Sequence, residues 1–289
     1  LALEAHRQRS STFRELDLRG WLGQEELKTW EALKVALSVG LMPLLHSAAS
    51  VQAAGKGDNM GEAFRFAHLS LQEYLFAARA ASQIEAGAGS EVPALRTLLS
   101  EAWWARSLEF LAEAFTPQCQ TLLRRGLAAW EPRRGPVEAS ALHLAAERGL
   151  PRVAKLLLDE GQAPGGVQHR SRHIYGSVEE TPLCCAAGRG SSCVVELLVE
   201  SRAELGGFQS VQVSPGGERR ERTPLYSAVE SGHLAVVRLL LQHGAPVDGV
   251  QYREGPGAQG AGGRGRQRSC ADAAGSEEMR ALLKRAEAR

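Results

Sequence analysis

Three segments of this chain repeat one pattern at nearly constant spacing, and such a repeat constrains the fold more than any other feature of a single sequence. They are residues 140–146, 181–187 and 223–229, each followed by a glycine and a run of valine and leucine. One unit of this kind cannot bury its apolar face alone, so neighbouring units must stack to form a continuous core. The pattern therefore predicts a repeat protein and points to binding rather than catalysis.

Each unit predicts a pair of short antiparallel helices. Thr181 and Thr223 are good N-cap residues, and a proline follows each at the first helical position, where a missing backbone N–H costs nothing. Alanines three and four positions after the motif leucine share one face, so neighbouring helices can approach closely. Gly161 and Gly244 should end the second helices of their units, where a left-handed residue is favoured.

Residues 223–248 read Thr-Pro-Leu-Tyr-Ser-Ala-Val-Glu-Ser-Gly-His-Leu-Ala-Val-Val-Arg-Leu-Leu-Leu-Gln-His-Gly-Ala-Pro-Val-Asp and closely resemble the ankyrin-repeat consensus. A worn fourth copy starts at Arg268, and its charged end suits a terminal cap. The resemblance implies a mostly α fold, an ankyrin-repeat solenoid of about four units with long hairpin fingers. The expected units cover residues 138–163, 179–205, 221–249 and 267–289.

The spacing of the units is longer than the ankyrin period of about 33 residues. Leu142 to Leu183 is 41 residues, and Leu183 to Leu225 is 42. The excess lies where the resemblance places the fingers, in segments rich in Gly, Pro, Arg and Ser, so we expect exposed loop there. These loops either carry partner specificity or are tolerated insertions, because loop length costs little free energy. The three segments are 162–180, 203–222 and 245–267.

The ankyrin resemblance implies an unidentified protein partner that is bound through the fingers and the groove. The candidate contacts are polar or aromatic residues of the fingers: Arg170, Arg172, His173, Tyr175, Phe208, Arg219, Arg220, Tyr252 and Arg253. His143 occupies the family's Thr-Pro-Leu-His position, where the ring links adjacent turns. Cys184 and Tyr226 replace it in the next two units, so the continuation of those hydrogen bonds is open.

The part of the chain before residue 138 does not contain the repeated pattern. Residues 64–68 alternate in a two-residue period typical of a short strand, and a helix should follow. Ser70 and Glu73 have the spacing of a capping box. The strand therefore delivers His68 to a helix N-terminus, which can hold a phosphate or carboxylate. One face of this helix should be formed by Leu71, Tyr74, Leu75 and Ala78.

Residues 64–78 are similar to the pattern that closes the winged-helix part of NACHT-type NTPases, the NOD-like class of STAND signalling ATPases. By this resemblance His68 would contact the nucleotide phosphate in a closed, ADP-bound state. An ordinary half-buried histidine is the alternative. Residues 1–85 would form the winged-helix-like α+β segment and residues 86–137 a helical domain or linker. The expected core of that domain is Leu95, Leu98, Leu99, Leu108, Phe110, Leu111, Leu122 and Leu123.

No Gly-x-x-x-x-Gly-Lys-[Ser/Thr] loop occurs in this sequence, since Gly55 to Gly57 lacks both the first glycine and the hydroxyl residue. We therefore expect no enzyme activity, no catalytic residue, no metal site and no cofactor in this chain. ADP or ATP would require a NACHT core upstream of Leu1, and a start other than Met suggests a fragment. The combined expectation is a sensor or scaffold array at the C-terminal end of a NACHT-ankyrin signalling protein. The alternative is the tail of an active STAND ATPase.

The net charge and the cysteine content limit the remaining classes of function. A formal net charge of +1 gives no general attraction to nucleic acid or membrane. Five cysteines without metal-ligand spacing suggest reduced packing residues in a cytoplasmic or nuclear protein. The arginine- and glycine-rich residues 262–268 leave a second alternative, an RNA-contacting finger, although a solvated loop is the more common meaning of one such tract.

Overall fold

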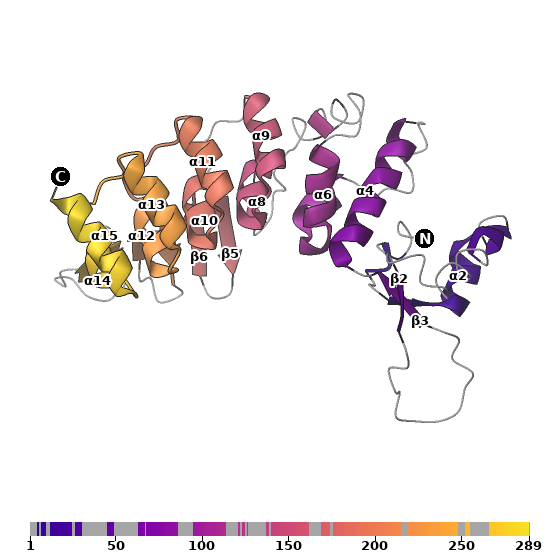
Figure 1. Ribbon diagram of the computed structural model, residues 1–289. Helices are drawn as coiled ribbons and strands as arrows, with labels where there is room; N and C mark the ends of the chain where they lie inside the picture. Colours follow the sequence, from indigo (N-terminus) through magenta and orange to yellow (C-terminus); the bar gives the residue numbers. More distant parts are fainter. Residues whose placement is uncertain are drawn as a thin grey trace. The chain divides into compact units, whose positions relative to one another are not determined.

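The computed structural model describes residues 5, 7–9, 12–24, 27–30, 45–48, 63–66, 68–85, 95–113, 121, 123–124, 126, 137–138, 140–161, 169–173, 176–214, 219–247, 252–254 and 266–288. The fold is mostly helical, as expected from the sequence (Figure 1). By its backbone contacts the chain divides into two compact units, Leu1–Leu122 and Leu123–Arg289.

The first unit contains a small antiparallel sheet in the order β1-β3-β2. Its strands are β1 (Thr12–Arg14), β2 (Leu45–Ala48) and β3 (Ala63–Phe66), so the strand predicted before His68 is present. Helix α2 (Glu15–Trp21) follows β1 directly. Phe13 is the centre of the apolar cluster here, because its ring lies 6.0 Å from that of Phe66 and 5.9 Å from that of Trp30 between centroids.

Helix α4 (Leu69–Glu85) follows β3, as predicted, but the capping box does not form. The helix begins at Leu69, one residue before Ser70, so Ser70 lies inside the first turn. The carbonyl of His68 accepts from the backbone N–H of Leu71 at 3.1 Å and of Gln72 at 3.4 Å. His68 therefore holds the cap position that the sequence assigned to Ser70, because the helix begins two residues earlier than expected.

The predicted buried face of α4 is also wrong. Tyr74 is 43% exposed, although its ring meets that of Phe110 edge-on, with centroids 5.6 Å apart. The helix packs on α6 (Ala105–Ala112), and Leu75 packs on the sheet cluster, so two neighbours rather than one set its buried stripe. The residues that this arrangement buries are Gln72, Glu73, Phe76, Ala77, Ala80, Ala81 and Gln83.

Helices α5 (Leu95–Ser100), η2 (Ala102–Trp104) and α6 complete the described helices of this unit. Most of the predicted helical core is buried: Leu98, Leu99, Leu108, Leu111 and Leu123. Leu123 belongs to the second unit, and Phe110 is only partly buried. The other two predicted core residues, Leu95 and Leu122, have no described side chain.

The second unit contains four helix pairs, one for each predicted repeat. The first helices of the pairs contact one another in one row and the second helices in another row (Figure 1). We call the first helix of each pair the inner helix and the second the outer helix. The inner helices are α8 (Ala141–Arg148), α10 (Pro182–Arg189), α12 (Pro224–Glu230) and α14 (Cys270–Ala273). The outer helices are α9 (Pro151–Asp159), α11 (Ser192–Glu200), α13 (Leu234–Gln242) and α15 (Glu277–Glu287).

The ends of these helices form as the sequence predicted. Thr181 and Thr223 cap α10 and α12 by accepting from the backbone N–H three residues later, at 3.2 and 3.1 Å. Gly161 and Gly244 take the left-handed conformation just after α9 and α13. Arg202 stands at the matching position after α11 and adopts φ 63°, a conformation that costs a non-glycine residue about 1 kcal/mol.

The described finger residues include six strands where we expected exposed loop. Seven antiparallel strands from all four repeats form one sheet, the finger sheet, in the order β10-β9-β8-β7-β6-β5-β4. The sequence did not reveal most of them because most of their residues are polar, so apolar alternation marks few of the strands, and each finger pairs with the next repeat. The strands are β4 (Val137–Glu138), β5 (His169–His173), β6 (Gly176–Glu180), β7 (Ser210–Val213), β8 (Arg219–Arg222), β9 (Tyr252–Glu254) and β10 (Arg266–Arg268).

Hydrogen bonds between adjacent repeats continue after His143 is replaced. The buried ring of His143 donates from Nε2 to the carbonyl of Glu180 at 2.9 Å, so its Nδ1 accepts from the Ser140 hydroxyl at 2.7 Å. In the second repeat Cys184 Sγ instead lies 3.2 Å from Ser227 Oγ of the third. The replacement therefore changes the chemistry of this contact without removing it.

Candidate functional site: the finger sheet and inter-repeat pocket

One face of the finger sheet turns toward the inner helices. The strand register places Ser210 between Glu180 and Arg222 in a single row across β6, β7 and β8. These three residues line a pocket together with residues of α10 and α12. Because alternate residues along a strand belong to opposite faces, this row identifies the side that we call the groove face.

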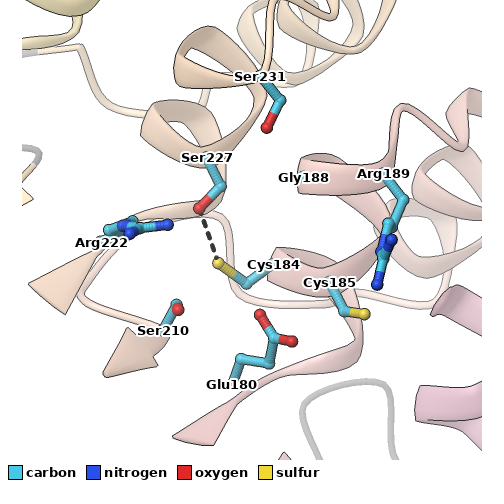
Figure 2. Close-up of a pocket in the computed structure, with 9 residues that line it drawn as sticks. All are labelled: Glu180, Cys184, Cys185, Gly188, Arg189, Ser210, Arg222, Ser227 and Ser231. Carbon is cyan, nitrogen blue, oxygen red and sulfur yellow. Dashed lines mark hydrogen bonds between the residues drawn. The ribbon is translucent and has the colours of Figure 1, made fainter. Parts of the chain in front are cut away.

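The pocket encloses about 260 Å³ between the second and third repeats. Figure 2 shows the Glu180 carboxylate directed toward Cys184 and Cys185, with Arg189 and Arg222 on opposite sides. Arg222 pairs with Glu230 at 3.1 Å, and Arg189 with Glu147 of the preceding repeat at 3.0 Å. The remaining lining residues are Gly188, Ser210, Ser227 and Ser231.

The pocket combines hydrogen-bond acceptors and donors. Burial raises the pKa of the Glu180 carboxyl, and the positive charge of Arg189 lowers it in part. The serine hydroxyls can donate or accept, whereas the guanidinium groups only donate. Such a site can bind both hydrogen-bond donors and acceptors of a partner, so the partner group need not carry a charge of one particular sign.

The two cysteines of the pocket are poor nucleophiles. Burial raises the pKa of the Cys184 thiol to about 12, and the hydrogen bond to Ser227 offsets this only in part. The pKa of Cys185 is also raised by burial. Since the thiolate is the reactive form of cysteine, both side chains remain protonated packing groups near neutral pH.

We expect the Glu180→Gln substitution to raise the melting temperature at pH 7. The raised pKa of Glu180 means that the folded protein holds this proton more tightly than the unfolded chain. Stability is therefore lost as the pH rises from about 4.3, the usual pKa of glutamate, through the folded-state value. Glutamine does not ionise and removes this loss. Thermal melts should show the difference at pH 7 and none near pH 4, and a lower melting temperature for the variant at pH 7 would contradict it.

The register divides the predicted partner contacts between the two faces. His173, Arg220 and Tyr252 belong to the groove face. Phe208 precedes β7 and is partly buried, while Tyr175 lies outside the described residues. The other candidates, Arg170, Arg172, Arg219 and Arg253, belong to the opposite face.

Sequence reasoning missed the residues that line the pocket. Glu180 and Arg222 each stand directly before the threonine that caps an inner helix, and Arg268 directly precedes the corresponding Ser269. The recurrence of a charged residue just before the cap in three repeats could have marked these positions as candidate site residues. The sequence alone does not place them in a pocket, because it does not show which finger residues share a row of the sheet with them.

His68 is exposed at the start of α4, so the alternative of a half-buried histidine is wrong. Its position agrees with the strand-to-helix placement that the sequence predicted. Its contact with a nucleotide phosphate stays a prediction.

Among the described residues, no group of three or more His, Cys, Asp or Glu side chains could hold a metal ion. None of the described helices is both long enough and apolar enough to span a bilayer.

Residues 142–250 match the family model of ankyrin repeats in three copies. The B-cell lymphoma 3 protein homolog of Mus musculus is 35% identical over 126 residues, which are 44% of this chain and 25% of that protein. A putative ankyrin repeat protein of Rickettsia felis is 32% identical over 120 residues, 42% of this chain and 47% of that protein. The chain thus matches less than half the length of either relative. These matches confirm the ankyrin resemblance over the first three repeats.

Proposed function

We propose that this chain is a protein-binding module whose contact surface is the groove face of the finger sheet together with the inner helices. Ankyrin repeats are protein-interaction modules, and three copies are present here. The observation that carries the proposal is the continuous sheet, because it joins three fingers and strand β4 into one surface beside the inner helices. A partner can therefore contact several repeats at once.

The chemistry of this surface supports binding rather than reaction. Its described charged groups include arginines and carboxylates that pair with one another, such as Arg222 with Glu230 at 3.1 Å and Arg189 with Glu147 at 3.0 Å. The thiols in the pocket are protonated, as argued above. Polar groups of this kind give an interface its specificity, while shape and buried contacts give it affinity.

Substituting groove-face residues of the fingers should abolish capture of the natural partner and leave the helices intact. The test variant changes Val178, Gln212, Arg220 and Arg268 to threonine, which retains strand propensity. The matched control changes four positions of the outer helices to alanine: Glu196, Glu200, Arg238 and Gln242. Pull-down from a lysate of the source organism measures binding, and circular dichroism measures helical content. Equal capture by the finger variant and the unmodified chain would refute the proposal.

We also propose that the first unit is the end of a NACHT-type regulatory module, with the array as its sensor or scaffold. The observation in favour is the exposed His68 at the N-terminus of the 17-residue helix α4, directly after a strand. Partner binding would then shift the module between closed and open states. The gene sequence before residue 1 tests this. A phosphate-binding loop and an acidic magnesium site there would support it, and their absence over several hundred residues would refute it.

A further inference from the structure

The strand register gathers arginines at one end of the groove face. In one row Glu254 stands between Arg220 and Arg266, and in the next row Tyr252 stands between Arg222 and Arg268. Over β8, β9 and β10 the groove face therefore carries four arginines and one glutamate. These arginines are up to 48 residues apart in the sequence, but neighbouring strands lie only about 4.8 Å apart.

The other end of the groove face is different. On β6 and β7 its residues are Val178, Glu180, Ser210 and Gln212, which include no arginine. Since the whole chain has a formal net charge of only +1, the positive charge at β8 to β10 is a local feature of this surface.

The described side chains of this arginine cluster are accessible. Arg220 and Arg268 are exposed, and Arg222 keeps 24% of its side chain exposed while it pairs with Glu230. Arginine presents a planar fork of N–H donors that matches a carboxylate in two-point contact. A row of such groups at strand spacing suits a partner whose carboxylates repeat along an extended backbone.

We propose that the groove face of β8, β9 and β10 binds an acidic peptide segment of the protein partner. The inference rests on the proposed function, because it names the chemistry of the partner at the same surface. A peptide fits better than a nucleic acid because the Glu180 carboxylate adjoins the arginine cluster and would oppose a continuous phosphate backbone. The adjoining pocket also offers the Glu180 carboxylate and serine hydroxyls, which can accept from the N–H groups of a peptide.

Fluorescence anisotropy with the full chain and fluorescein-labelled polyglutamate of about 20 residues tests the proposal at low salt, about 50 mM, where such contacts are least screened. The test variant is Arg220→Glu with Arg268→Glu. The control is Arg219→Glu with Lys284→Glu, which changes the total charge equally at exposed positions, one on the opposite face and one on α15. We expect about a tenfold loss of affinity for the test variant and less than about twofold for the control.

Equal losses in the two variants would overturn the proposal, because the attraction would then follow net charge rather than this surface. So would tighter binding of polyuridylate than of polyglutamate through the same arginines. If the test variant does not fold, as judged by circular dichroism, Arg220→Gln with Arg268→Gln replaces it and should weaken binding about threefold. If polyglutamate is not bound while the finger substitutions still abolish capture of the natural partner, this inference fails and the proposed function stands.

Discussion

Replacing Gly190 with alanine is expected to destabilise the repeat array by about 3 kcal/mol. Gly190 ends α10 at φ 76°, a left-handed conformation that costs a residue with a Cβ about 1 kcal/mol. The added Cβ would lie 2.6 Å from Nδ1 of His233 in the next repeat. His233 would have to move and give up its 3.1 Å contact from Nε2 to the carbonyl of Gly188, a bond between repeats.

The chain supplies a matched control for this substitution. Gly232 follows α12 at φ 80°, and a Cβ added there would meet no atom within 4 Å. Gly232→Ala should therefore cost only the backbone term of about 1 kcal/mol. Urea denaturation followed by circular dichroism measures both values. Equal destabilisation by the two variants would show that the close approach of His233 does not contribute to the loss of stability in Gly190→Ala.

Replacing Gln209 with alanine should cost about 2–4 kcal/mol, because it removes the partner of the buried Thr181 hydroxyl and of two backbone carbonyls. The side-chain oxygen of Gln209 accepts from the Thr181 hydroxyl at 2.7 Å. Its nitrogen donates to the carbonyls of Glu204 at 2.6 Å and Gly206 at 2.9 Å. Gln209 is buried, so water cannot replace these bonds without entering the space between two repeats.

Gln212, three residues further along the chain on β7, is the control for Gln209. Its side chain is only partly buried and accepts one long hydrogen bond, from Arg222 at 3.3 Å. We expect Gln212→Ala to cost less than about 1 kcal/mol. The free energy of unfolding in urea distinguishes the two. A Gln209 variant no less stable than the Gln212 variant would mean that the backbone bonds, from Thr181 N to Gln209 O and from Gln209 N to Arg222 O, hold this junction without the side chain.

The repeats could be predicted from the sequence because their determinants are local. Capping by Thr181 and Thr223 depends on residues three positions apart, and so does the ending of helices at Gly161 and Gly244. The first unit was harder to predict. Residues 64–78 gave the strand and the helix, but the cap fell at His68 and the buried face was rotated, since α4 packs on both the sheet cluster and α6.

The candidate site could be predicted only in part. The finger arginines were identified as accessible positions, and Arg219 and Arg220 are exposed. The sequence did not separate them, although consecutive strand residues belong to opposite faces. It also did not show Glu180 and Arg222 as members of one pocket, because Ser210 brings them into one row only when three strands are in register.

The sequence by itself determined that residues 142–250 contain ankyrin repeats, since the repeated leucines, alanines and caps specify each helix pair from nearby residues. The tertiary structure alone decided that the fingers form one sheet, which of their residues share the groove face, and where the pocket and the arginine cluster lie. The physical reason is that strand pairing joins residues of different repeats through backbone hydrogen bonds, which carry no signature of the side chains involved.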